Sequence, residues 1–409
     1  MKMNLKLIFL LSALAAISID LHAEQLSISL MPVDGVQRGV YTKAINQFRE
    51  KYPRIDVKVR VDEHEYYKQH IDQFLIETPN KADVYFWFGG QKLKNLAAKG
   101  AVFPLTQAWN RNNWNRNFSD STRAAITFNN QMYGLPLYYY QWGFYYSKSL
   151  FQKLNLEIPV SWEDFIDTCN KLSKSGITPI ALASNDLWPN ASWFDYFNLR
   201  INGLEFHNQL MAGTISYESQ EVTTVFNYWK QLLDAQAFTA NHEELEWHLT
   251  LPRIFHKKEG MILMGNFLLA LASDTVRNDL GFFPFPILDK TVPRFEEAPL
   301  DILIVSQNST NKKEALLFLE FMATPVIQSQ IASELYMTPA NVKAKRSRDE
   351  FIDAGYKLIE SAEGTSQFFD RDSIPEFSEA AMSSLVSFLT HRDIRRVQTE
   401  LEQLRLKFY

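Results

Sequence analysis

The stretch over residues 133–150 (YGLPLYYYQWGFYYSKSL) constrains the fold more than any other part of the chain. Pro136 fixes its own φ and favours an extended conformation at Leu135, so the chain is expected to pass through here as a strand. Six aromatic residues lie within 138–145, and Tyr146 adds a seventh. Because successive side chains of a strand point to opposite faces, one set of rings can enter a core while the other lines a cleft. We interpret this stretch as a crossover strand between two lobes, with a binding site beside it.

The segment before the crossover predicts an α/β arrangement. Strands and helices alternate in their apolar patterns. Residues 82–88 (ADVYFWF) are continuously apolar, which is typical of a strand buried on both faces of a parallel sheet. The predicted elements are a strand over 26–30, a helix over 35–51, a strand over 54–61, a helix over 63–77 and a strand over 82–88.

Three candidate ligand-binding residues follow from the expected strand ends. Ligands of open α/β sheets bind beyond the carboxyl ends of the strands. Trp87 and the Gly89-Gly90 turn are therefore expected at a cleft, and Asp34 and Arg38 follow the first strand at the same edge. The Gly-Gly turn lacks the G-x-G-x-x-G and G-K-[ST] patterns of a phosphate loop.

Three further candidates lie in one segment of the second half, and two lie in the crossover. One of Tyr140 and Trp142 is expected to line the cleft, and alternation does not decide which. Trp188, Trp193 and Asp195 belong to a W-x4-W-F-D segment that we interpret as a ligand-contacting loop.

Helical patterns dominate the rest of the second half. Residues 161–164 (SWED) have the form of a capping box, which predicts that a helix begins there and that Trp162 packs at its start. Residues 260–265 predict a short buried strand, and 266–272 a helix after it. From residue 377 onward, apolar residues recur at helical spacing, so this tail is expected to pack against the second lobe. Trp247 lies in a polar stretch, and its role is undecided.

Composition limits the classes of partner. The chain has 409 residues, of which 46% are hydrophobic, which suits one large or two medium domains. The net charge of −5 gives no electrostatic argument for binding nucleic acid or an anionic membrane. No nucleic-acid partner is therefore expected.

Residues 1–23 have the pattern of a secretory signal peptide. A lysine-containing start precedes a run over 7–19 that is apolar apart from two serines, and residues 21–23 (LHA) predict cleavage near Ala23. No Cys stands directly after the apolar run, which argues against a lipid anchor. The single Cys, Cys169, cannot form an internal disulfide. Together these features predict a protein exported to a bacterial periplasm.

Nine motifs along residues 25–339 resemble, in their order, the extracellular solute-binding proteins of ABC importers. The resemblance is to the sugar-binding group that includes maltose-binding protein. Each motif is weak alone, but nine in order over most of the chain form a specific pattern. They are FREKYPRIDVKV (48–59), ADVYFWFGG (82–90), LAAKGAVFPL (96–105), MYGLPLYYYQWGFYYSKSLFQKLNLEIPVSWEDF (132–165), KLSKSGITPIAL (171–182), FHKKEGMILMGNF (255–267), GFFPFP (281–286), VSQNSTNKKEALLFLEFMATP (305–325) and LYMTPA (335–340).

The resemblance implies a two-lobed periplasmic-binding-protein fold of type II, in which each lobe is a mostly parallel sheet flanked by helices. The ligand cleft lies between the lobes, which close around the ligand by hinge motion. The implied N-terminal lobe comprises residues 24–137 plus 301–337, and the C-terminal lobe comprises 138–300 plus 338–409. Crossovers are expected near Tyr138, Leu300 and Pro339.

The resemblance also bears on particular residues. Trp87 matches the family's cleft tryptophan at the end of the third strand. Asn266 and Phe267 stand where the family often carries Gly-Trp, so this chain departs from the pattern there. Asp301 occupies a hinge position where the family often has Gly. Its carboxylate could bind ligand hydroxyls, or it could be a solvated turn residue.

The function implied is a periplasmic receptor that captures a sugar or oligosaccharide and delivers it, as a monomer, to an ABC permease. Pyranose C–H faces stack on aromatic rings, and sugar hydroxyls pair with amide, carboxylate or guanidinium groups. The alternatives are a ligand sensor for a membrane kinase or chemoreceptor, a receptor for a non-sugar solute, and a periplasmic enzyme acting on oligosaccharides. The sequence lacks G-x-S-x-G and zinc-protease motifs, so no catalytic residue, metal or cofactor is expected.

Overall fold

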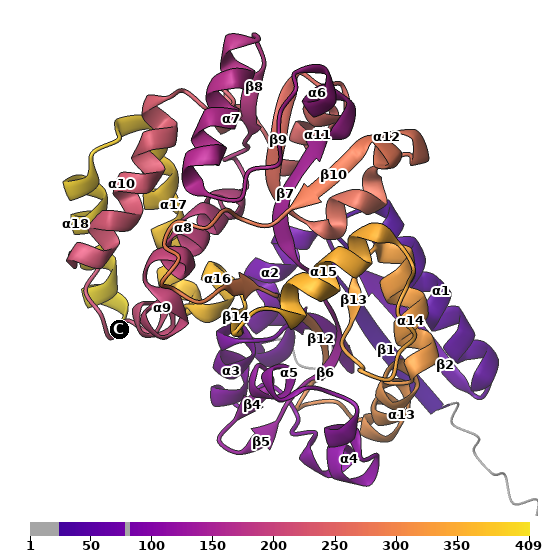
Figure 1. Cartoon of the computed structure of the whole chain (residues 1–409). Coiled ribbons are helices and arrows are strands. Elements are labelled where there is room, and N and C mark those ends of the chain that lie inside the picture. The colour runs from indigo at the N-terminus through magenta and orange to yellow at the C-terminus, as the bar shows by residue number, and fades with distance from the viewer. Residues whose placement is uncertain (1–23, 78–81) are drawn as a thin grey trace, which may run out of the picture.

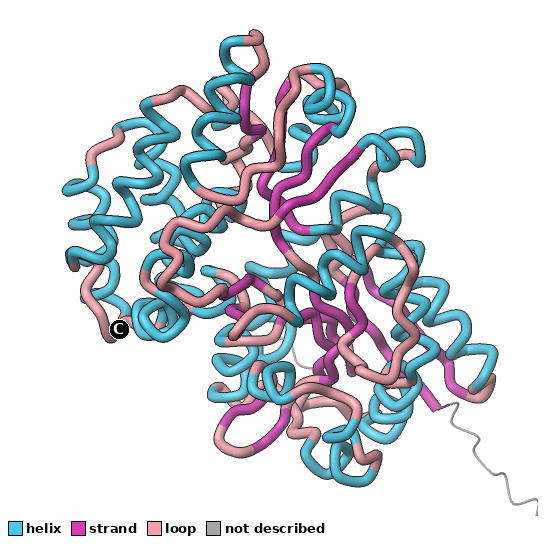
Figure 2. Tube along the Cα trace, in the orientation of Figure 1, coloured by secondary structure: helices cyan, strands magenta, loops and turns pink. Residues whose placement is uncertain are grey.

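The computed structural model describes residues 24–77 and 82–409, so the predicted signal peptide lies outside the described residues. Two separate β-sheets form the centres of two lobes, and helices cover both sheets (Figure 1). Figure 2 shows the two groups of strands apart from each other, with the chain passing between them.

The first lobe contains a six-stranded sheet in the order β13-β6-β12-β3-β1-β2. Strand β1 pairs in parallel with β2 and β3, whereas β12 is antiparallel to β3 and β6, and β13 is antiparallel to β6. A short hairpin of β4 and β5 lies outside this sheet. The strands are β1 (Glu24–Leu30), β2 (Ile55–Val61), β3 (Val84–Phe88), β4 (Thr127–Phe128), β5 (Gln131–Met132), β6 (Leu135–Tyr139), β12 (Leu300–Val305) and β13 (Thr338–Pro339).

Helix α1 shows why the first lobe follows its sequence pattern closely. The helix spans Gly35–Lys51, as predicted, because the Asp34 carboxylate accepts a hydrogen bond from the Gln37 N–H at 2.7 Å and caps its start. Val40, Ala44 and Phe48 lie on its buried face. The other helices of this lobe are α2 (His64–Asp72), which continues into a π-helical turn (Gln73–Glu77), α3 (Gln91–Ala98), α4 (Thr106–Arg111), α5 (Asp120–Ala124), α13 (Lys312–Met322) and α14 (Pro325–Leu335).

The second lobe contains a four-stranded sheet in the order β10-β7-β9-β8, in which only β8 and β9 are parallel. Most strands of each sheet run in one direction, as expected, with β7 reversed in this sheet and β12 and β13 reversed in the first. The strands that bring the chain across, β7 and β12, begin at the cleft and run away from it. Their neighbours β9 and β3 end at the cleft, so the pairs are antiparallel. The strands are β7 (Trp142–Ser147), β8 (Thr178–Ala181), β9 (Glu259–Gly265) and β10 (Leu280–Phe283).

Helices of the second lobe confirm the predicted capping box. Ser161 and Asp164 cap each other reciprocally, and Trp162 packs in a buried position at the helix start, as expected. The helices are α6 (Lys148–Lys153), α7 (Trp162–Lys174), α8 (Trp188–Ile201), α9 (Gly203–Met211), α10 (Gln220–Asp234), α11 (Trp247–Phe255) and α12 (Asp274–Asp279), and short 3-10 turns occur at Trp114–Arg116, His242–Glu244 and Asn266–Leu271.

The C-terminal tail packs against the second lobe, which confirms that prediction. Helices α17 (Pro375–His391) and α18 (Ile394–Phe408) lie beside α8 and α10 at one edge of the molecule (Figure 1). Before them, α15 (Glu350–Glu360) leads to β14 (Gly364–Ser366), which pairs with β11 (Phe295–Glu297). The short helix α16 (Phe369–Asp372) contacts α8 of the second lobe and α3 of the first, so it bridges the two lobes.

Tyr140 and Gln141 alone separate β6 of the first sheet from β7 of the second. The aromatic stretch is thus a strand that changes sheets, as predicted, while the lobe boundaries as a whole stay a prediction. Within residues 24–77 and 82–409 no single helix is long and apolar enough to cross a membrane. Only α13 and α14 taken together reach that length and composition, and they are bent by 67°.

Candidate functional site

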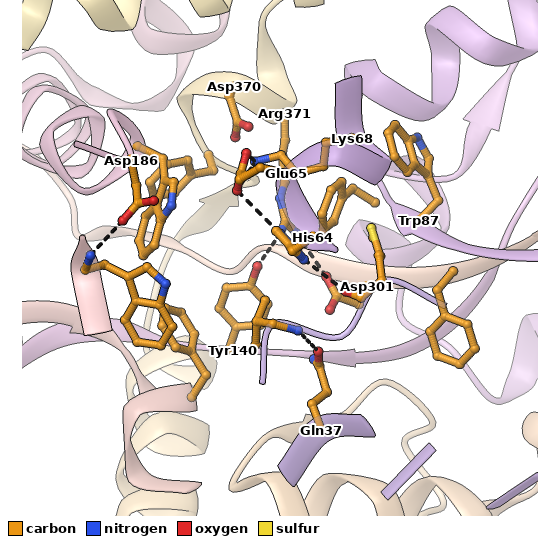
Figure 3. A pocket seen from close by; sticks show the side chains of 18 of the residues that line it. Gln37, His64, Glu65, Lys68, Trp87, Tyr140, Asp186, Asp301, Asp370 and Arg371 are labelled. Atoms are coloured by element: carbon orange, nitrogen blue, oxygen red, sulfur yellow. Dashed lines mark hydrogen bonds and ion pairs between the residues drawn. The ribbon is translucent and has the colours of Figure 1, made fainter. Parts of the chain in front are cut away.

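A cavity of about 240 Å³ lies between the lobes and is lined from both sides. We call one side the first-lobe wall; it includes Gln37, Tyr41, His64, Lys68, Trp87, Phe88, Asp301 and, from the bridging tail, Asp370 and Arg371. We call the other side the second-lobe wall; it includes Trp142, Asp186, Trp188, Glu246, Trp247, His248 and Phe267. Tyr140 lies at the junction. Figure 3 shows Trp87 and Asp186 on opposite sides of the cavity, with Tyr140, Asp301 and Arg371 between them.

Several of these side chains lie at the ends of strands that reach the cavity. Trp87 and Phe88 end β3, and Asp301 pairs with Phe88 at the start of the neighbouring strand β12. Tyr140 follows β6 directly. Neighbouring strands thus bring the ring of Trp87, the carboxyl group of Asp301 and the phenol of Tyr140 to one edge of the first sheet.

Arg371 occupies the centre of the site. Its guanidinium Nη1 lies 3.2 Å from Asp301 Oδ1, and its Nη2 donates a hydrogen bond to the Tyr140 hydroxyl. The guanidinium carbon also stands 3.9 Å from the ring centroid of Phe88. Burial raises the pKa of Asp301, and the Arg371 charge opposes that rise. A buried guanidinium and carboxylate need each other, because either charge alone would be costly at this depth.

A second ion pair ties the tail to the first lobe. Lys92 Nζ lies 2.6 Å from Asp370 Oδ2, and both side chains are buried. Burial alone would raise the pKa of Asp370, but the surrounding cations, Lys92 first, lower it overall. Gly90 makes the close approach possible: its φ is +80°, and a Cβ there would stand 2.7 Å from the Arg371 carbonyl oxygen. The Gly89-Gly90 turn therefore leaves room for α16 to pack beside the cleft.

Polar groups of α1 and α2 complete the first-lobe wall. Gln37 Nε2 donates to the Tyr138 hydroxyl at 3.2 Å, and that hydroxyl also hydrogen bonds to Tyr41. His64 Nδ1 lies 3.0 Å from the Met31 carbonyl oxygen. Burial lowers the pKa of His64 to about 3, so the imidazole is neutral near pH 7.

The second-lobe wall is mostly aromatic. The ring centroids of Trp142 and Trp188 are 5.9 Å apart at 83°, and those of Trp247 and Phe267 are 5.2 Å apart at 89°. Trp188 also lies 5.9 Å from Trp247 and 6.0 Å from Phe267. The backbone N–H of Trp247 donates to Asp186 Oδ2 at 2.6 Å, and this hydrogen bond joins the starts of α8 and α11. Rings and carboxylates thus face a set of polar groups across the cavity.

The cleft continues outward. A second hollow of about 370 Å³ shares Lys68, Trp87, Asp186, Trp188 and Asp370 with the first. Small-molecule sites are concave, largely apolar, and carry a few convergent polar groups. This arrangement suits a small polar solute with apolar faces, and the outward extension leaves room for a longer one.

The family model of bacterial extracellular solute-binding proteins matches residues 35–329. The chain belongs to this family. An uncharacterised ABC transporter extracellular-binding protein of Pyrococcus horikoshii is 26% identical over 297 residues, which cover 72% of this chain and 67% of the relative. The multiple sugar-binding protein of Streptococcus mutans is 24% identical over 206 residues, 48% of each chain. The chain is thus an extracellular solute-binding protein of the ABC-transporter type.

Solved structures confirm the two-lobed fold. The bacterial solute receptor AcbH, described as having an exclusive preference for β-D-galactopyranose, superposes with a TM-score of 0.89 at 25% identity. That match covers 94% of this chain and 99% of AcbH. A chitin oligosaccharide binding protein superposes with a TM-score of 0.86 at 19% identity, covering 94% of this chain and 98% of its own. The fold class implied by the resemblance is therefore confirmed.

Five of the ten predicted site residues line the cavity of this solute-binding protein: Trp87, Tyr140, Trp142, Trp188 and Asp301. Tyr140 and Trp142 do so together, although only one was expected to. Their positions have the same parity along the strand, so both rings face the cavity while Gln141 turns the other way, toward the Phe351 carbonyl oxygen. That these residues bind ligand stays a prediction.

Trp193 and Asp195 do not line the cavity, and the expected loop is wrong: residues 188–201 form helix α8. Trp193 lies about 140° around the helix from Trp188 and is buried among Phe144, Phe238 and other rings. Asp195 is two turns below Trp188, where its Oδ2 accepts the Phe369 N–H at 2.6 Å. Burial raises the pKa of both Asp195 and its neighbour Glu297.

Asp34, Arg38 and Asn266 are also placed outside the cavity lining. Asp34 caps α1 and Arg38 is exposed on that helix, because the inward face of α1 begins at Gln37. Asn266 is buried, and its Nδ2 donates to the Tyr336 carbonyl oxygen, which links the two lobes. Asp34 and Asn266 hydrogen bond to neighbouring backbone groups and Arg38 is exposed, so none of the three lies in the cavity wall.

Sequence reasoning missed most of the polar site. Arg371 and Asp370 lie about 70 residues after Asp301, just before the tail helices expected from residue 377 onward, in a stretch for which no role was predicted. Gln37 and Tyr41 share the inward face of α1, so helical periodicity could have found them. Asp186 and Glu246 precede Trp188 and Trp247 closely in sequence, and that paired pattern was the available signal for them.

Proposed function

We propose that this protein captures a saccharide between its two lobes in the periplasm and delivers it, as a monomer, to the permease of an ABC importer. The observation that carries the proposal is the cavity itself, which has aromatic rings on one side and hydrogen-bonding groups on the other. Rings can stack on the apolar faces of a pyranose, and the paired polar groups suit its hydroxyls. In this proposal the protein is a binder and not an enzyme.

The kinship supports a saccharide over other solutes. AcbH binds β-D-galactopyranose with exclusive preference, and the relative in Streptococcus mutans is named as a multiple sugar-binding protein. The outward extension of the cleft supports a ligand of one or a few sugar units. Closing of the lobes around the ligand would present a distinct surface to a membrane partner.

The test is thermal unfolding of the chain from Glu24 onward with a panel of mono- and oligosaccharides. A ligand that binds only the folded state adds RT ln(1 + [L]/Kd), about 2.7 kcal/mol at a hundredfold excess over Kd. We expect at least one saccharide to raise the Tm, and amino acids and polyols to leave it unchanged. If no saccharide raises the Tm while another solute class does, the assignment is overturned.

Binding and turnover are separated by product analysis. The protein is incubated with each saccharide that raises its Tm, and the mixture is analysed by mass spectrometry. Unchanged saccharide is the expected result, whereas cleaved or modified sugar would show an enzyme. Delivery is tested by co-purification of the loaded protein with its permease, with a sensor-kinase ectodomain as the competing partner.

A further inference from the structure

The second-lobe wall is an aromatic box. Trp142, Trp188, Trp247 and Phe267 all line the cavity, and most neighbouring rings are inclined steeply to each other. Trp188 and Trp247 are tilted by 56°. The electron-rich faces of such rings attract a cation, and aromatic cages of this kind bind ammonium groups.

Two carboxylates stand at the edge of this box. Asp186 precedes Trp188 by two positions, and Glu246 precedes Trp247 directly, so each acid is held at the start of a helix that carries a ring. One carboxylate oxygen of Asp186 accepts a hydrogen bond from the backbone N–H of Trp247. Within the described residues no Lys or Arg pairs with either acid; the nearest basic group is the His248 ring, 3.6 Å from Glu246.

Every cation of the cavity already has a carboxylate partner. Arg371 is paired with Asp301, and Lys68 with Glu65 at 3.0 Å. Asp370 in turn holds Lys92. The paired charges of the first-lobe wall therefore cancel. Glu63, which caps α2, leaves one negative charge on that side, and Asp186 and Glu246 leave two on the other.

Further observations fit a ligand that carries positive charge and hydrogen-bond acceptors. The pKa of Asp186 is raised by its burial and by the nearby carboxylates Glu65 and Glu246, so the surroundings of this acid are electronegative. The indole N–H of Trp142 is buried in the wall, and no acceptor for it lies among residues 24–77 and 82–409. Its nitrogen has almost no accessible surface, so a ligand hydroxyl oxygen could accept from this donor only after the wall rearranges.

We propose that the saccharide bound here carries a protonated amine, as an amino sugar does, and that its ammonium group lies against the aromatic box between Asp186 and Glu246. This inference rests on the proposed function and names its ligand class. Neutral sugars would bind more weakly, because they leave the two carboxylates uncompensated. Uronic acids would bind worst, because their carboxylates would face those of the wall.

Matched sugars test the proposal. Glucosamine, N-acetylglucosamine and glucose differ only at C2, and so do galactosamine, N-acetylgalactosamine and galactose; the β1→4-linked glucosamine dimer, diacetylchitobiose and cellobiose extend the set. Calorimetry at about pH 6, where an alkylamine is protonated, gives each Kd. We expect the amine to bind about tenfold more tightly than its neutral partners, the size of one cation–π contact with a carboxylate beside it. Equal or tighter binding of the neutral sugars would overturn the inference and leave the saccharide function intact.

A smaller probe tests the box without the sugar. Choline and 3,3-dimethylbutan-1-ol have nearly the same shape and differ in charge, so their relative quenching of tryptophan fluorescence reports on the cation alone. Choline is expected to bind more tightly. If choline shows no preference and no amino sugar binds, the inference fails. If choline is preferred but no saccharide binds, the cation site stands and the saccharide assignment is the part that fails.

Two variants locate the charge. Asp186→Asn and Glu246→Gln keep the shape of the wall and remove one negative charge each, so each is expected to reduce the preference for amine over neutral sugar by about threefold or more. Glu244→Gln removes a charge from an exposed acid just outside the cavity lining and serves as the control. Equal loss of affinity for amine and neutral sugars in both variants would assign the carboxylates to hydroxyl binding and overturn the inference.

Discussion

The two walls of the cleft are built on opposite principles. The first-lobe wall places its charges in pairs, Arg371 with Asp301 and Lys92 with Asp370, so they satisfy one another before any ligand arrives. The second-lobe wall places aromatic rings beside two acids without a Lys or Arg partner among the described residues. The comparison indicates that one wall holds the molecule together across the cleft, while the other is left unsatisfied and available to a ligand.

Replacing Arg371 is the strongest test of whether the first-lobe wall stabilises the fold. Arg371→Leu leaves Asp301 buried without a counter-charge, so the free energy of unfolding is expected to fall by about 3–5 kcal/mol in urea denaturation. Arg396→Leu is the matched control, since Arg396 pairs with Glu400 on an exposed helix at 2.8 Å and is expected to cost no more than about 0.5 kcal/mol. A loss as small as that of the control would show that the first-lobe wall is not structural.

Truncation of the second-lobe wall should affect binding and not folding. Trp188→Ala removes one side of the aromatic box, and we expect it to weaken the Kd of the best saccharide by about 30-fold or more, as for a central aromatic anchor. Trp193→Phe, in the same helix but away from the cavity, is the control. It is expected to lower the Tm and to keep the Kd within about twofold, since its ring packs only in the core. Calorimetry and thermal unfolding of both variants separate the two effects.

Two glycines measure how tightly the tail is held against the first lobe. Gly90 and Gly100 both have positive φ, but a Cβ meets the Arg371 carbonyl oxygen at Gly90 and open space at Gly100. Both alanine variants should lose about 1–3 kcal/mol from backbone strain, Gly90→Ala the more, because its ψ of −151° belongs to a region that is essentially restricted to glycine. Gly90→Ala should lose about 1–2 kcal/mol more than Gly100→Ala, because α16 must move. Equal losses, measured by urea denaturation, would mean that α16 is free to shift.

The smallest expected effect concerns His64 of the first-lobe wall. Burial lowers its folded-state pKa to about 3, so between about pH 6.5 and pH 3 the unfolded chain takes up a proton that the folded chain does not. Stability is therefore lost as the pH falls below about 6.5, by at most about 2 kcal/mol down to pH 5. His64→Gln is expected to flatten this part of the curve, and His256→Gln, at an exposed position, to leave it unchanged. If the stability of His64→Gln still falls steeply as the pH drops below about 6.5, another group causes that loss.

Much of the fold followed from local patterns. Residues 35–51 carry both a capping aspartate and an apolar face, and residues 82–88 are apolar throughout, so propensity and burial agreed there. Residues 188–201 misled the prediction, because proline and asparagine near the start resemble a loop. The structure uses Pro189 at the first turn of a helix instead, where its missing N–H costs nothing.

The sequence by itself determined many of the elements, the sheet-changing strand at 138–146 and the family, because each of these depends on the order and spacing of residues along the chain. Only the tertiary structure decided which polar groups meet in the cleft. Arg371 reaches Asp301 across about 70 residues, and Asp186 reaches the backbone of Trp247 across about 60. Local periodicity does not reveal such pairs. The burial of a charged group and the charges near it depend on which distant segment packs against it.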